Sequence, residues 1–398
     1  AYVMSLAENP NRKGMLFAGT GNAFYYSMDD GARWTQFKTG LPASPVTWIV
    51  VAKLNHDVVL STYGRGLFVL RDITMLEQSD KVVADAPVQV YEPRAGLRQA
   101  RNGSIDFTFN LRAAPKDTVK FEFVDSTGTV VRTMRGTVRV GANRVTWDLR
   151  HEGPKQVELR TTPPDNPYIW DEPRFKNRVI RPIVHWGIQG PQRTGPLAHP
   201  GKYTFRMTVD GIAHTQPFTI IKDPAITSSV GDLVLSTRAQ ARIRDNIDTT
   251  VAVINRLEIM RKQIEDLVKS DSTAADLKAV LKDFDQKALD VELKLLTRSD
   301  LHSDDKWYVE QYKVYLNLLW LAGEVGTGAS DVAGGAEYKP TDASMGVLAE
   351  IERDLGVARV AFATLMDKDL PAFNRTMAGK LPPITDKLPS ARPATILP

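Results

Sequence analysis

Apolar and polar residues alternate along much of the first 222 residues, and this pattern predicts short β-strands. In residues 1–76, strands are expected near 2–7, 14–19, 23–28, 34–37, 46–53, 57–62 and 66–71. In residues 88–222, the alternation continues at Ile105, Phe107, Phe109, Val119, Phe121, Phe123, Val138, Val140, Val145 and Trp147. From Gly231 onward the apolar spacing changes to three and four residues, which predicts helices. The chain is therefore expected to be multidomain, with β-rich parts followed by an α-helical part.

Residues 1–76 contain an internal repeat. A shift of 43 residues lays residues 16–20 on residues 59–63 and Asp29 on Asp72 without a gap. A period near this length, with several short strands in each unit, is typical of β-propeller blades. We therefore expect one complete blade and one partial blade, which are the last two of a propeller. Their partners would be missing N-terminal blades of the same protein, because open sheet edges and faces need covering. The alternative is a small independent β-sheet domain.

The turn at residues 27–34 has the pattern S-x-D-x-G-x-x-W, with Ser27, Asp29, Gly31 and Trp34 at the fixed positions. This pattern is an aspartate box, which marks the turn between two strands of a propeller blade. Asp29 can accept hydrogen bonds from backbone N–H groups, and Gly31 can adopt a backbone conformation that other residues resist. Trp34 is expected to pack the returning strand against the blade face. All four residues are expected to be structural.

The strands of residues 88–222 predict an immunoglobulin-like or fibronectin-like β-sandwich, which follows a polar linker at residues 77–87. An irregular insertion at residues 150–199 interrupts it and is rich in Pro, Arg and aromatic residues. Within this insertion, Tyr168, Trp170, Arg181 and Trp186 form a candidate binding patch for sugar rings or a protein partner. The alternative is that these side chains clamp the domain onto the propeller or the helices.

Residues 228–378 are expected to form a four-helix antiparallel bundle, followed by a proline-rich tail at residues 379–398. The seam positions of the first two helices are Val253, Leu257, Met260, Ile264, Leu267, Leu277, Leu281, Phe284, Ala288, Val291 and Leu295. Those of the last two are Tyr308, Tyr312, Tyr315, Leu319, Ala322, Leu348, Leu355, Phe362 and Leu365. The expected N-caps of the second, third and fourth helices are Ser272 and Thr273, Ser303 and Asp304, and Thr341 or Asp342.

Composition excludes several classes of site. The chain has no cysteine, so it has neither disulfides nor thiolate metal sites. Its net charge of +4 over 398 residues, without a dense basic stripe, argues against a nucleic-acid partner. It has no apolar run of about 18 residues that would span a membrane. The six histidines lack zinc-binding spacing, and nucleophile-elbow and phosphate-loop motifs are absent. Tyr63 and Arg65 are a possible sialidase-like pair, but residues 64–66 predict a turn between strands, so no catalytic residue, metal or cofactor is expected.

The order of these parts resembles a known family. The aspartate box is followed by residues 58–72, VVLSTYGRGLFVLRD, which resemble the last blades of bacterial sortilin-like proteins with aspartate-box repeats. These proteins are often labelled BNR-repeat glycosyl hydrolases. Residues 201–211 and 215–224 are similar to the closing segment of the family's immunoglobulin-like module, and residues 369–374 to the end of its last long helix.

The resemblance implies a large propeller followed by a sandwich and a helical region in an exported protein, periplasmic or on the surface of a bacterium. Because the sequence begins in what reads as mid-strand, we expect it to be a C-terminal piece of that protein. The expected function is non-catalytic: binding protein or polysaccharide, and bracing the propeller or a larger assembly. The alternative is the accessory end of a propeller glycoside hydrolase whose catalytic carboxylates lie upstream of this chain.

Overall fold

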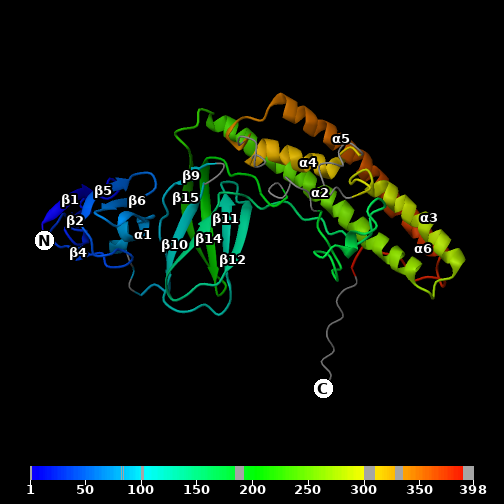
Figure 1. Cartoon of the computed structure of the whole chain (residues 1–398), viewed down its shortest axis with the longest axis horizontal. Helices are drawn as coiled ribbons and strands as arrows, with labels where there is room; N and C mark the ends of the chain where they lie inside the picture. Colours follow the sequence, from blue (N-terminus) through cyan, green and yellow to red (C-terminus); the bar gives the residue numbers. More distant parts are fainter. Residues whose placement is uncertain are drawn as a thin grey trace, which may run out of the picture. The chain divides into compact units, whose positions relative to one another are not determined.

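The computed structural model describes residues 2–81, 83, 85–99, 103–183, 192–299, 310–327 and 335–388. The chain divides into two compact units. Unit 1 comprises Ala1–Arg150 with Ala198–Ile226, and unit 2 comprises His151–Leu197 with Thr227–Pro398. Unit 1 contains all the named β-strands and unit 2 the long helices, so the expected mixture of several sheets and a C-terminal helical region is confirmed (Figure 1).

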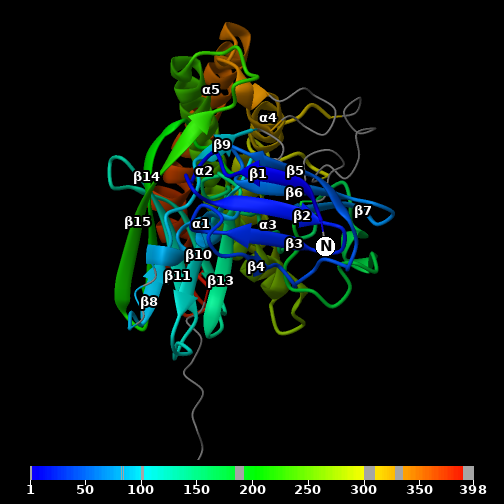
Figure 2. The ribbon, with the colours of Figure 1, turned by 90° about the vertical axis from the view of Figure 1, so that its left-hand side faces the viewer.

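Two antiparallel sheets follow one another at the start of unit 1 (Figure 2). The first sheet has the order β1 (Val3–Glu8), β2 (Leu16–Thr20), β3 (Phe24–Ser27) and β4 (Thr35–Gln36). The second sheet has the order β5 (Val46–Ala52), β6 (Asp57–Thr62) and β7 (Gly66–Leu70). A short helix, α1 (Thr74–Glu77), follows β7 where the repeat would place a fourth strand. Each repeat therefore folds as a meander in the same strand order.

The registers of the two sheets correct the gap-free alignment of the repeat. In the first sheet Ser5, Gly19 and Phe24 form one cross-strand row. The corresponding row of the second sheet is Trp48, Ser61 and Leu67. The outer strands are therefore related by 43 residues but the middle strands by 42, since Gly19 matches Ser61. The reason is in the connections: Gly19 is 14 positions after Ser5 but Ser61 is 13 after Trp48, whereas Phe24 is 5 positions after Gly19 and Leu67 is 6 after Ser61.

The two sheets stack on a shared apolar core. Its buried members are Met15, Phe17, Phe24, Val46, Ile49, Val58, Leu60 and Ile73. The rings of Phe17 and Phe24 stack with their centroids 5.7 Å apart. The sheets approach closely at Gly19, where a Cβ would stand 2.5 Å from the Val46 carbonyl oxygen. Only glycine fits this position while the sheets stay in contact.

Two further sheets complete unit 1. One has the order β13 (Gly141–Trp147), β10 (Ile105–Leu111), β8 (Val88–Val90). The other has the order β12 (Val130–Gly136), β11 (Val119–Asp125), β14 (Gly201–Val209), β15 (Ile212–Lys222), β9 (Gly96–Arg98), and its last pair is parallel. Aromatic side chains join them: Phe107 stacks on Phe205 at 4.4 Å and Phe123 on Trp147 at 4.5 Å.

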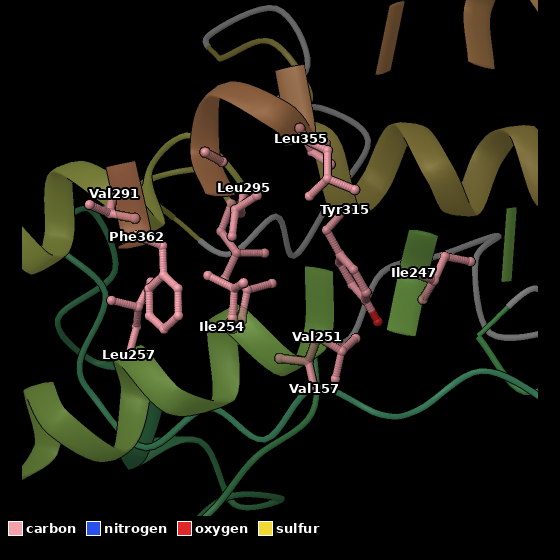
Figure 3. Close-up of a cluster of buried hydrophobic side chains, with 14 of the residues drawn as sticks. Val157, Ile247, Val251, Ile254, Leu257, Val291, Leu295, Tyr315, Leu355 and Phe362 are labelled. Atoms are coloured by element: carbon pink, nitrogen blue, oxygen red, sulfur yellow. The ribbon is translucent and has the colours of Figure 1, made fainter. Parts of the chain in front are cut away.

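The helices of unit 2 are α2 (Val230–Lys269), α3 (Ala275–Glu292), α4 (Val314–Ala322), α5 (Asp342–Thr364) and α6 (Leu370–Thr376). Helix α2, which is about 60 Å long at 1.5 Å per residue, contacts α3, α4 and α5. The predicted seam residues of α2, α3 and α5 lie in the shared core or pack against it, except Leu277, which is half-buried and outside this core. Ile254, Leu257, Val291, Leu295 and Phe362 lie close together in Figure 3. One π-helical turn, Gly323–Thr327, follows α4, and another, Leu365–Asp369, joins α5 to α6.

The predicted helix starts are correct in one case and wrong in another. Thr341 caps α5, because its side chain accepts the backbone N–H of Ser344. The N-cap of α3 is Ala274, so the prediction of Ser272 or Thr273 is wrong. The predicted cap at Ser303 and Asp304 and the seam position Tyr308 lie outside the described residues. Tyr312 precedes α4, which begins at Val314, so the helical stripe is shorter than predicted.

The insertion packs with the helices. Val157, Leu159 and Ile183 are buried in the same core as the residues of α2. Figure 3 shows Val157 beside Val251 of α2. A β-bridge between Leu159 and Arg181 ties the two arms of the insertion together. The segment that interrupts the sheets of unit 1 in the sequence is therefore part of unit 2 in space.

Candidate functional site

The aspartate-box turn uses its polar atoms internally. The Asp29 carboxylate accepts the Ser27 hydroxyl at 2.8 Å and the backbone N–H of Arg33 at 2.8 Å. The Ser27 hydroxyl in turn accepts the N–H of Gly31 at 2.9 Å. The N–H of Arg33 and the hydroxyl of Ser27 lower the pKa of Asp29, because both favour its charged form. This carboxylate holds the turn and is not arranged for acid–base chemistry.

The backbone explains the residue choice in this turn. Gly31 has a φ of +90°, and Asp30 before it has a φ of 58°, so two consecutive residues are left-handed. A Cβ at Gly31 would meet the Trp34 ring at 3.7 Å, so the indole lies against this glycine. Trp34 is still 40% exposed.

The second repeat reproduces this turn chemistry at Asp72. Its carboxylate accepts the N–H of Thr74 at 3.2 Å and the Thr74 hydroxyl at 2.6 Å. Its own N–H donates to the Asp57 carboxylate at 2.9 Å. Asp72 has a φ of 48° and is buried, so it too is committed to a turn. The sequence shift that matched Asp29 with Asp72 therefore matched two residues of the same role.

The four residues of the predicted patch differ in exposure. The Arg181 guanidinium lies 5.4 Å from the centre of the Trp170 ring, so these two residues do meet. Arg181 is only 2% exposed, and its guanidinium donates to the Thr161 carbonyl at 3.2 Å. Tyr168 is exposed, whereas Trp170 is half-buried. Trp186 lies outside the described residues, so the structure brings together one pair of the four.

A buried charged network lies beneath this pair, and the sequence pattern did not predict it. The Arg261 guanidinium contacts the carboxylates of Glu292 at 2.9 Å, Asp285 at 3.1 Å and Glu258 at 3.4 Å. Burial alone would lower the pKa of Arg261, but the three carboxylates outweigh it and raise the pKa. The guanidinium therefore stays charged inside unit 2, where an ion needs partners.

Glu258 also holds the insertion on α2. Its carboxylate accepts the backbone N–H groups of Arg160 and Thr161, the second at 2.8 Å. The Thr161 hydroxyl lies 3.2 Å from Arg261. The insertion is thus bound to the helix by charge-assisted hydrogen bonds as well as by apolar contacts. The sequence gives only a weak signal for this network: Glu258 and Arg261 come directly after the seam residues Leu257 and Met260.

The second sheet has an uncovered apolar face. We call it the open face of the second sheet, and its members are Trp48, Val50, Val59, Leu67 and Val69. Trp48 is 67% exposed and Leu67 is 73% exposed, although both lie in the middle of the repeat's strand pattern. On the first sheet, Leu6 is likewise 64% exposed. Contiguous exposed apolar residues on a sheet indicate an interaction surface.

Two other kinds of site have no candidate in the described part of the chain. None of its helices is long and apolar enough to cross a membrane. No group of three or more His, Asp or Glu residues among the described residues is arranged to hold a metal ion.

Comparison with known proteins gives only remote similarities. No protein-family model matches the chain, and no curated protein matches it. Among solved structures, it is similar to a biofilm-associated protein BSP domain, with a TM-score of 0.19, 11% identity, and coverage of 44% of this chain and 29% of that chain. A second similarity is to the extracellular domain of a hybrid two-component system from B. thetaiotaomicron, with a TM-score of 0.16, 10% identity, and coverage of 56% and 25%. The chain thus spans less than a third of the length of either structure, and neither likeness supports a statement on fold or function.

Proposed function

We propose that this chain is the non-catalytic C-terminal region of an exported, sortilin-like aspartate-box propeller protein. In this proposal residues 1–76 are its last two blades, residues 88–222 an immunoglobulin-like sandwich and residues 228–378 a helical bundle. The blades dock onto further blades of the same protein. The sandwich and helices brace that assembly and bind protein or polysaccharide.

The observation that carries the proposal is a correspondence between open and covered faces. Trp48 and Leu67 on the open face of the second sheet correspond to Ser5 and Phe24 of the first sheet. That face of the first sheet is covered by the second sheet, with the Ser5 hydroxyl donating to the Val46 carbonyl at 3.2 Å. The face that is uncovered in the second sheet is therefore the counterpart of the face that is covered in the first sheet.

The reverse correspondence also holds. The row Leu6, Ala18 and Tyr25 of the first sheet matches the row Ile49, Leu60 and Phe68 of the second. Ile49 and Leu60 are buried between the sheets, whereas Leu6 is exposed. Ala18, the counterpart of Leu60, is already buried. The pair of sheets thus has two different outer faces, and each is the counterpart of a face that is buried between the sheets. Contacts of this head-to-tail kind either close into a ring or continue without limit, and a propeller is the closed form.

Association of the chain with itself tests the docking. In the isolated chain, the open face of the second sheet should bind the outer face of the first sheet, which carries the exposed Leu6, of another copy, in place of a further blade. We expect concentration-dependent association in sedimentation velocity. The double substitution W48K and L67K should weaken it by at least about tenfold, because it removes two large apolar contacts from the centre of the face.

The control is V130K on β12, which places a lysine at another exposed apolar position of unit 1. It should leave association unchanged. A chain that stays monomeric at high concentration, or one that associates equally well with W48K and L67K, would contradict the proposal. Hydrolysis of β-glucan or xyloglucan by the full-length protein, abolished by replacing an upstream aspartate, would instead favour the accessory end of a glycoside hydrolase.

A further inference from the structure

A cavity of about 550 Å³ lies on the polar face of the three-stranded sheet β13-β10-β8. Thr108 of β10 and Arg144 of β13 are cross-strand partners in its floor. The connection before β13 supplies Arg139, and Met75 of α1 forms part of the wall. All these residues belong to unit 1. The volume is within the range of small-molecule sites.

The lining of this cavity is cationic. It includes Arg139 and Arg144 and no carboxylate side chain. Arg144 has one counter-ion outside the lining, the Asp106 carboxylate at 3.3 Å. The Arg139 side chain forms no ion pair with any other described residue. Two guanidinium groups and a single carboxylate leave a net positive charge at the cavity, which favours an oxyanion as ligand.

Thr108 provides an independent observation. Its side chain is 4% exposed, and its hydroxyl is buried without a hydrogen-bond partner among the described residues. A buried hydroxyl without a partner is costly, so such groups are rare in folded proteins. Because Thr108 lines the cavity, a polar ligand group there would supply the missing hydrogen bond.

The wall that carries Arg139 is held in place before any ligand binds. The Asn143 side chain accepts the backbone N–H of Arg139 at 3.0 Å. Its amide nitrogen donates to the carbonyls of Arg139 at 2.6 Å and Gly141 at 2.8 Å. A connection fixed in this way loses little conformational entropy on binding.

We propose that this cavity binds a carboxylated sugar, of the uronic acid class, as a free sugar or as one residue of an acidic polysaccharide. Arg139 and Arg144 hold the carboxylate, and the Thr108 hydroxyl bonds a sugar hydroxyl. Met75 and Val138, two apolar residues of the lining, contact the C–H face of the ring. The site is separate from the open sheet faces, so ligand binding at the cavity does not depend on blade docking.

Titration calorimetry on the whole chain tests the site, with galacturonate and glucuronate oligosaccharides as probes and glucose oligosaccharides, sulfate and phosphate as comparisons. We expect binding of at least one uronate probe and none of the neutral sugars. R139Q and R144Q should each weaken uronate binding about tenfold or more, since each removes a charge-assisted hydrogen bond. R135Q, on exposed Arg135 of the other sheet, is the matched control and should bind like the parent chain.

T108V separates a binding role from a structural one. Valine has the shape of threonine without the hydroxyl, so the variant should be at least as stable as the parent, because it removes an unpartnered buried group. Its uronate binding should still be weaker. The proposal is overturned if no uronate probe binds, if sulfate or phosphate binds better than uronates, or if T108V and R139Q bind like R135Q.

Discussion

At the scale of single residues, charged side chains that attract attention in the sequence mostly hold the backbone in place. Asp29 and Asp72 accept hydrogen bonds within their own turns. Arg181, a member of the predicted patch, is buried and bonded to the Thr161 carbonyl. Arg261 and Glu258 fix the insertion to α2 through the same Thr161. These charged groups hold the backbone in place, because each of them forms hydrogen bonds or ion pairs with nearby groups.

The Arg261 network should be sensitive to the loss of its one central cation. R261M leaves the carboxylates of Glu258 and Glu292 buried without it, so we expect the free energy of unfolding of unit 2 to fall by about 3–5 kcal/mol. Urea unfolding followed by circular dichroism at 222 nm measures this change. The control is R353M, which removes Arg353 from an exposed pair with Glu350 and should cost less than about 1 kcal/mol. Equal losses in the two variants would contradict a stabilising role of the network.

At the scale of secondary-structure elements, the local signal was clear for the strands of residues 1–76, wrong at Val138 and Val140, which lie between β12 and β13, and ambiguous for helix starts. The alternation of apolar residues predicted every strand from β1 to β7, with β4 shorter than expected. Helix α3 begins without a side-chain cap at Ala274, although Ser272 and Thr273 stand just before it. The Ser272 hydroxyl instead lies 2.8 Å from that of Ser270. Several neighbouring residues can each serve as the N-cap of a helix, and the packing of the helix decides where it begins.

This difference between caps can be measured. T341A and S229A should each destabilise unit 2 by about 1 kcal/mol, because each removes a side chain that caps a helix. S272A should change stability by less than about 0.5 kcal/mol, since Ser272 caps no helix. Chemical unfolding of the three variants under one set of conditions gives the comparison. A loss in S272A as large as in T341A would show that α3 begins earlier than described.

At the scale of the whole molecule, the order of segments along the chain differs from their grouping in space. Residues 151–197 leave the sheets of unit 1 and belong to the helical unit. The two arms of the insertion run close together at its base, since a Cβ at Gly195 would stand 2.1 Å from the His151 carbonyl oxygen. A Cβ at Gly153 would stand 2.3 Å from the Arg193 carbonyl oxygen. Two glycines are needed there because the backbones touch.

Removing the insertion should therefore weaken the helices and spare the sheets. In a variant that lacks residues 155–192, α2 loses the cover of Val157 and Leu159 as well as the bonds to Glu258. We expect hydrogen exchange of α2 amides near Leu257 to accelerate by at least about tenfold, as follows from exposing one buried apolar side chain. Amides of β11 and β14 in unit 1 serve as the internal control and should exchange as before. Faster exchange in both units, or in neither, would contradict this grouping.

The strand-rich and helix-rich parts, the 43-residue repeat and the turn roles of Asp29 and Gly31 could be predicted from the sequence alone. These features depend on neighbouring residues, whose periodicity and backbone preferences are local. The one-residue register change at Gly19, the burial of Arg181 and the place of the insertion on α2 became visible only in the folded chain. The same holds for the cavity at Thr108, because its lining joins α1 to two parts of a sheet. Such features depend on contacts between residues far apart in the chain, and no local pattern records which distant segment covers a given face.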